Sequence, residues 1–146
     1  MAGWKHYEPE QRGTTCVIDR EQVRDLPYEI GHVSTGKQKV FHRYYVKITL
    51  ADGSEIIGED PHNIRTALFH VDQELGKRHC ILIAAGVEKD FSESGLSHNS
   101  GYGYLPNIDR AIHMMDLPPP RQRGYDGDEF VSNLIREAVA GMFRAR

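Results

Sequence analysis

Apolar and polar residues alternate most clearly in VFHRYYVKITL, residues 40–50, which predicts a strand with one buried face. The following ADGS contains an Asp-Gly pair, which is typical of a two-residue hairpin turn. The chain would then return as the strand SEIIG. A two-residue turn would place Ile57 beside Ile48 on the buried face.

A stripe of apolar residues at three- and four-residue spacing predicts a helix over residues 61–76. Asp60 is a suitable N-cap, and Gly76 suits the position just past the C-terminal end. A second stripe predicts another helix near the C-terminus, over residues 128–144. The residues of the first stripe are Ile64, Ala67, Leu68, Val71 and Leu75.

Three shorter segments complete the predicted sheet. Residues 14–18 are rich in β-branched side chains, residues 79–86 form a short apolar run typical of a strand buried on both faces, and residues 110–117 form a last strand. We therefore expect an α+β fold. It has a mainly antiparallel sheet of about four or five strands, with two principal helices, 61–76 and 128–144, packed on it.

The remaining segments are expected to connect these elements within a single domain, residues 1–146. Residues 1–12 are polar and are predicted to be flexible. Residues 19–38 are weakly patterned, and Asp19 could cap a short helical turn there. Residues 117–127 contain three consecutive prolines, 118–120, and are expected to form a linker to the last helix, because proline cannot donate a backbone hydrogen bond.

Composition narrows the classes of function. The chain of 146 residues is 39% hydrophobic and 27% charged, which is typical of a globular protein rather than a disordered one. It has 18 basic and 21 acidic residues, a net charge of −3. Nucleic-acid-binding proteins usually carry a basic surface that neutralises phosphates, so we do not expect a nucleic-acid partner.

The cysteines and the longest apolar run indicate a cytoplasmic protein. Cys16 and Cys80 are far apart in sequence and belong to no paired ligand motif, so neither a disulfide framework nor a metal site is expected. The run CILIAAGV is too short to span a bilayer, and the N-terminal residues lack the apolar region of a secretory signal. No membrane association and no cofactor are expected.

The segment SESGLSHNSGYGYLPN, residues 92–107, is the predicted binding surface. It lies within residues 87–109, where apolar residues recur with neither helical nor strand spacing. Ordered loops of this length are usually functional. Tyr102 and Tyr104 suit recognition, because tyrosine supplies contact area at low entropic cost. The alternative is that both rings pack into the core. The expected partner-binding residues are Tyr102, Tyr104, His98, Glu88, Asp90, Glu93 and Asp109.

Two tripeptides suggest a catalytic alternative. His32-Val-Ser34 and His98-Asn-Ser100 have the form H-x-S, and the pair resembles the two-histidine phosphoesterases. The resemblance covers only these residues, and it implies that one imidazole accepts a proton while the other donates one. Both tripeptides are predicted to lie in loops. His113 is the other histidine that could act with His98.

Three functional hypotheses follow. The first is a non-catalytic binding protein that engages a basic protein partner through the loop of residues 92–107. Its concrete form is an immunity-type inhibitor that neutralises a bacterial toxin or effector. The second is a histidine-dependent phosphodiesterase or nuclease that uses His98 with His32 or His113. The third is an oligomer-forming scaffold, such as a homodimer, which mass in solution would distinguish.

Overall fold

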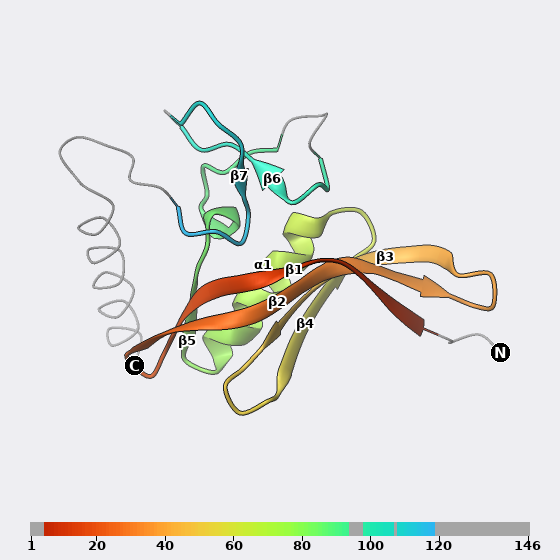
Figure 1. Ribbon diagram of the computed structural model, residues 1–146, viewed down its shortest axis with the longest axis horizontal. Coiled ribbons are helices and arrows are strands. Elements are labelled where there is room, and N and C mark those ends of the chain that lie inside the picture. Colours follow the sequence, from red (N-terminus) through yellow and green to blue (C-terminus); the bar gives the residue numbers. More distant parts are fainter. Residues whose placement is uncertain (1–4, 94–97, 107, 119–146) are drawn as a thin grey trace.

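A five-stranded antiparallel sheet is the main element of the computed structural model, which describes residues 5–93, 98–106 and 108–118 (Figure 1). Neighbouring strands follow the order β4-β3-β2-β1-β5. This confirms the α+β class and the antiparallel sheet. The strands are β1 (Lys5–Asp19), β2 (Gln22–Thr35), β3 (Val40–Thr49), β4 (Glu55–Asp60) and β5 (Cys80–Ile83).

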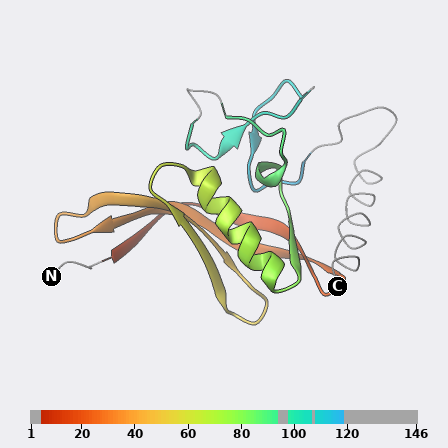
Figure 2. The ribbon, with the colours of Figure 1, turned by 180° about the vertical axis from the view of Figure 1, so that it is seen from behind.

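One α-helix, α1 (Ile64–Lys77), is present in the described part of the chain, and Figure 2 shows it crossing one face of the sheet. The second predicted helix, over residues 128–144, lies outside the described residues, as does the proline-rich linker from residue 119 onward. Within the described residues, no helix is long and apolar enough to cross a membrane.

The long hairpin of β1 and β2 corrects two predictions. Strand β1 begins at Lys5, so most of residues 1–12 is a strand and not a flexible end. The helical turn expected after Asp19 is absent, because Arg20 and Glu21 form a two-residue turn with φ of 49° and 70°. Such a turn lets β2 pair with β1 from Gln22 onward.

Strand β2 was not predicted from the sequence because it contains Pro27 and Gly31, and both residue types usually interrupt a strand. Pro27 pairs with Thr14 of β1 and lies just beyond the ladder from β2 to β3, which ends at Tyr28. Proline is found in a strand where its nitrogen has no hydrogen bond to donate to a neighbouring strand. Gly31 is needed because a Cβ there would lie 2.1 Å from the backbone oxygen of Glu8. The pairing of β1 with β2 shifts register at this point, between Pro9 and Gln11.

The predicted hairpin of β3 and β4 is present, but its register differs by one residue. Ile48 pairs with Ile56, which is buried, while Ile57 is 39% exposed. The loop contains three residues, 51–53, and not two, with Gly53 at φ +88°. One extra loop residue moves each side chain of the returning strand to the opposite face.

Helix α1 begins three residues later than predicted. Asp60 accepts hydrogen bonds from the backbone of His62 and Asn63, and Asn63 is the N-cap. At the other end Gly76 lies inside the helix, and His79 takes the positive φ of 60°. The predicted apolar stripe is confirmed as the buried face, formed by Ile64, Ala67, Leu68, Val71 and Leu75.

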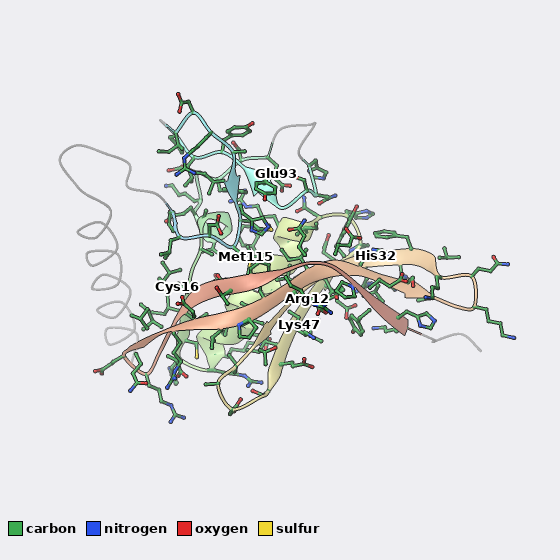
Figure 3. The ribbon with its side chains drawn as sticks, viewed as in Figure 1. Arg12, Cys16, His32, Lys47, Glu93 and Met115 are labelled. Carbon is green, nitrogen blue, oxygen red and sulfur yellow. The ribbon has the colours of Figure 1, made fainter. Side chains whose placement is uncertain are left out.

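The sheet face opposite α1 carries a network of ion pairs around Glu29. Its carboxylate lies 3.0 Å from Arg12 Nε and 3.6 Å from Lys47 Nζ, and it accepts a 2.6 Å hydrogen bond from the Tyr45 hydroxyl (Figure 3). Tyr45 is fully buried, and burial together with Glu29 raises the pKa of its hydroxyl. Ion pairs and a buried hydrogen bond therefore hold the polar face of β3.

The last two predicted strands are shorter than expected. Strand β5 covers only Cys80–Ile83 and lies at the edge of the sheet, followed by a 3₁₀ turn, η1 (Ala85–Val87). Strand β7 (Ile112–His113) does not join the main sheet but pairs with β6 (Tyr102–Gly103). These short elements belong to the loop layer, which we define as the described residues of 84–118.

Candidate functional site

Backbone hydrogen bonds give the loop layer a fixed shape beside the sheet and α1 (Figure 1). Ser92 and Tyr104 exchange two backbone hydrogen bonds, of 2.9 and 2.7 Å. The backbone N–H of Met114 donates to the Gly101 oxygen at 2.7 Å, and that of Gly86 donates to the Met114 oxygen at 2.8 Å. The segment predicted as a long loop is therefore ordered where it is described.

Arg65 of α1 holds the first half of the loop layer. Its guanidinium donates to the backbone oxygens of Gly86, Glu88 and Phe91, at 3.0, 2.7 and 2.6 Å. The same group lies over the rings of Phe69 and Phe91, 5.0 and 5.2 Å from their centroids. One charged side chain thus satisfies three carbonyls of a turn that has no regular ladder.

Asn99 connects the second half of the loop layer to α1. Its side-chain oxygen accepts a 2.9 Å hydrogen bond from Ile64, and its side-chain nitrogen donates to the backbone oxygen of His62 at 3.1 Å. Its own backbone N–H donates to Glu93 at 2.8 Å, and the Glu93 side chain is only 8% exposed. Glu93, labelled in Figure 3, therefore has a structural contact within the layer.

Two glycines allow close packing beneath the tyrosines. A Cβ at Gly103 would lie 2.5 Å from the Phe91 ring and 2.6 Å from the Ser92 oxygen. Gly101 has φ +90°, and a Cβ there would lie 2.9 Å from His113 Nε2. Neither position accepts a side chain without rearrangement.

Tyr102 and Tyr104 are 46% and 41% exposed, and we call the pair the tyrosine surface. Alternation explains why they point outward, since Gly103 and Leu105 between and after them are buried. The alternative, in which both rings pack into the core, is therefore wrong. Both rings project from a backbone that is fixed by the contacts described above.

A cavity of about 530 Å³ adjoins Tyr102, and we call it the tyrosine cavity. At its wall His113 stacks on Tyr28, with ring centroids 5.7 Å apart, and meets the Tyr102 ring edge-on at 4.9 Å. Burial raises the pKa of Tyr28, and the Asp116 carboxylate adds to this shift. The residues that line the cavity are Glu10, Gln11, Arg12, Tyr28, Tyr102, His113 and Asp116.

Both ring nitrogens of His113 are engaged within the protein. Nδ1 accepts a 3.1 Å hydrogen bond from the backbone of Met115, so Nε2 carries the proton and donates to Gln11 Oε1 at 2.7 Å. Gln11 in turn donates to the backbone oxygen of Ser100 at 2.8 Å. Burial lowers the pKa of His113, although Asp116 acts in the opposite direction. The neutral imidazole therefore connects β1 to the loop layer.

The acidic residues predicted at the site have different environments. Asp90 and Asp109 are exposed, and Glu88 is partly buried. Glu93 accepts a hydrogen bond from the backbone N–H of Asn99. Sequence analysis missed Asp116, which is exposed at the rim of the tyrosine cavity, and Glu10, which lies on β1. The carboxylates that line the cavity beside Tyr102 are therefore Glu10 and Asp116, and neither was predicted.

The two H-x-S tripeptides lie on different elements. His32 is in strand β2 and not in a loop, and its ring nitrogens lie 2.5 Å from Glu10 and 3.0 Å from Glu8 (Figure 3). Ser34 is fully buried. His98 is exposed in a turn, with Nδ1 4.0 Å from Glu93.

His32 and His98, two of the expected catalytic histidines, each contact a carboxylate. No contact joins the imidazoles of His32 and His98 in this part of the chain, and neither residue lines the tyrosine cavity. Ser100 lies beside the cavity through its backbone oxygen, which accepts from Gln11. A search of the described ranges also finds no group of three or more residues able to hold a metal ion.

Comparisons with protein-family models, with curated proteins and with solved structures find no match. The geometry of the loop layer and its cavity is therefore what bears on function. Two properties stand out there: exposed aromatic rings on a fixed backbone, and a neighbouring cavity with acidic residues at its rim.

Proposed function

We propose that the chain is a non-catalytic binding protein that engages a protein partner through the tyrosine surface and the tyrosine cavity. The observation that carries this proposal is the exposure of Tyr102 and Tyr104, at 46% and 41%, on a backbone that Arg65 and Asn99 hold in place. Aromatic residues on a preorganised backbone bind with little loss of conformational entropy.

The charge around this surface favours a basic partner. Glu10 and Asp116 line the cavity, and Asp90 and Asp109 are exposed on the loop layer. Arg12 also lines the cavity and forms an ion pair with Glu29 at 3.0 Å, and Glu10 contacts the His32 ring, so Asp116 is the lining carboxylate that contributes most to the negative charge. A lysine or arginine side chain of the partner would meet tyrosine rings and carboxylates here, an arrangement that attracts cations.

An immunity-type inhibitor of a bacterial toxin or effector is the concrete form that we propose. Such a protein needs a stable surface complementary to its target and no chemistry of its own. His113 supports this form over the phosphodiesterase hypothesis, since hydrogen bonds to Met115 and Gln11 occupy both of its nitrogens. A general base needs a nitrogen free to accept a proton from the substrate.

The first test is affinity capture from a lysate of the source cells, with the wild-type chain, the double variant Tyr102→Ala/Tyr104→Ala and the variant Phe41→Ala as baits. Phe41 is a matched control, because it is an exposed aromatic residue, at 48%, on strand β3. We expect wild type and Phe41→Ala to retain the same protein and the double variant to lose it.

The second test concerns inhibition. The captured protein is expressed in a bacterial host together with each of the three chains, and growth is followed. We expect growth arrest that wild type and Phe41→Ala relieve and that the double variant does not. Hydrolysis of a phosphodiester by the purified chain, together with capture of no protein, would refute the proposed function.

A further inference from the structure

A second cavity, of about 460 Å³, lies where three turns meet at one end of the sheet, away from the residues that line the tyrosine cavity. The turns join β1 to β2, β3 to β4, and α1 to β5. We call it the arginine cavity. Its lining residues are Asp19, Arg20, Arg24, Leu50, Ala51, Asp52, Arg78 and Cys80.

Basic side chains outnumber acidic ones around this cavity. Its lining holds three arginines and two aspartates, which leaves one positive charge in excess. Arg24 donates to Gln22 at 2.7 Å through Nη2, while its Nε lies 3.6 Å from an oxygen of Asp19. Arg78 donates to the Ser54 hydroxyl at 3.4 Å, which is near the limit of a hydrogen bond.

The Arg24 Nε is buried, and among the described residues no group accepts a hydrogen bond from it. The 3.6 Å separation from Asp19 is too long for a good hydrogen bond. Buried polar groups without a partner are rare and often mark the place of an unseen ligand or water. Arg24 also lines the cavity, so this donor belongs to a side chain that an anion in the cavity would contact.

Two of the turns beside this cavity have unusual backbone angles. Of the five non-glycine residues with positive φ in the described part of the chain, Arg20, Glu21 and His79 lie in these turns, with φ of 49°, 70° and 60°. Two-residue turns of this kind usually contain asparagine or glycine at such positions. Strain of this kind is common at binding sites.

We propose that the arginine cavity binds a small phosphate-bearing molecule, with Arg20, Arg24 and Arg78 as the groups that contact the anion. Guanidinium groups match the geometry of phosphate oxygens and stay charged at all physiological pH values. A volume of about 460 Å³ also holds more than the anion alone, which favours an organic phosphomonoester over inorganic phosphate. The site is independent of the partner surface proposed above.

The test is an NMR titration of the ¹⁵N-labelled chain with inorganic phosphate and, separately, with glycerol 3-phosphate, at constant ionic strength. Saturable shifts are expected for the backbone amides of Arg20 and Arg78 and for the Nε–H of Arg24. Tighter binding of glycerol 3-phosphate identifies an organic phosphomonoester, and equal affinities identify the phosphate group alone. Shifts that grow without saturation, or that map elsewhere, would overturn the proposal.

Two variants make the test specific. Arg78→Gln and Arg20→Asn should each weaken phosphate binding about tenfold or more, because each removes one charged donor. Asparagine tolerates the positive φ of residue 20, so Arg20→Asn keeps the turn. Arg110→Gln is the control, since Arg110 is exposed and lines neither cavity. Unchanged affinity in Arg20→Asn would contradict the proposed site.

Discussion

Replacement of Arg65 by methionine tests whether one side chain orders the loop layer. Methionine keeps an unbranched apolar stem that can still pack on Phe69 and Phe91, but it removes the guanidinium. The backbone oxygens of Gly86, Glu88 and Phe91 would lose their charged donor.

The expected loss of stability follows from these three hydrogen bonds. A hydrogen bond to a charged group contributes about 1.5–3 kcal/mol, so three bonds set an upper bound of about 9 kcal/mol. Arg65 is only partly buried, and water can reach some of the freed carbonyls. We therefore expect the free energy of unfolding to fall by about 3–5 kcal/mol, a large share of the 5–15 kcal/mol typical of a domain.

Urea denaturation followed by circular dichroism measures this loss. Arg65→Lys keeps the charge but cannot reach all three carbonyls, so an intermediate loss is expected. Arg110→Met is the matched control on an exposed arginine and should change stability by less than about 0.5 kcal/mol. A loss below about 1 kcal/mol for Arg65→Met would refute the role of Arg65 in ordering the loop layer.

Two further predictions concern the support of the tyrosine surface. Gly103→Ala should lower the free energy of unfolding by about 2–4 kcal/mol in the same assay, because the added Cβ would overlap the Phe91 ring. Gly76→Ala is the control on α1, where a Cβ meets open space, and it should raise the free energy of unfolding by up to about 1 kcal/mol. Equal effects of the two alanines would contradict this packing. Burial lowers the pKa of His113, so below pH about 6.5 the imidazole binds a proton more readily in the unfolded chain than in the folded one. The free energy of unfolding should therefore fall as the pH drops from 7 to 5. His113→Phe should make that fall less steep, and an identical pH profile of unfolding would show that His113 does not contribute.

Features that depend on neighbours along the chain were predictable from the sequence. The apolar stripe of α1 and the presence of the hairpin between β3 and β4 are both local, and both are confirmed. The register of that hairpin was wrong because a loop of three residues and one of two have nearly the same sequence pattern. The N-cap was predicted at Asp60 but is Asn63, because both residue types accept the same backbone hydrogen bonds at the start of a helix.

Features that depend on distant residues were not predictable. Strand β2 was missed because Gly31 is required by the Glu8 backbone, 23 residues earlier in the chain, and not by a turn. The wall of the tyrosine cavity was missed for the same reason. Gln11 and His113 are 102 residues apart, and no local pattern connects them. Tyr28 had a signal in its alternation with Leu26 and Ile30, but the intervening Pro27 concealed it.

The affinity of the captured partner for the purified chain tests the central claim most directly. Isothermal titration calorimetry would compare wild type, Tyr102→Ala/Tyr104→Ala and Phe41→Ala, after urea denaturation has shown that each chain is folded. Loss of two aromatic hot-spot residues should weaken binding by about 2–4 kcal/mol, which is about 30-fold or more, while Phe41→Ala binds as wild type does. Equal affinity for wild type and the folded double variant would contradict the assignment of the tyrosine surface as the binding site.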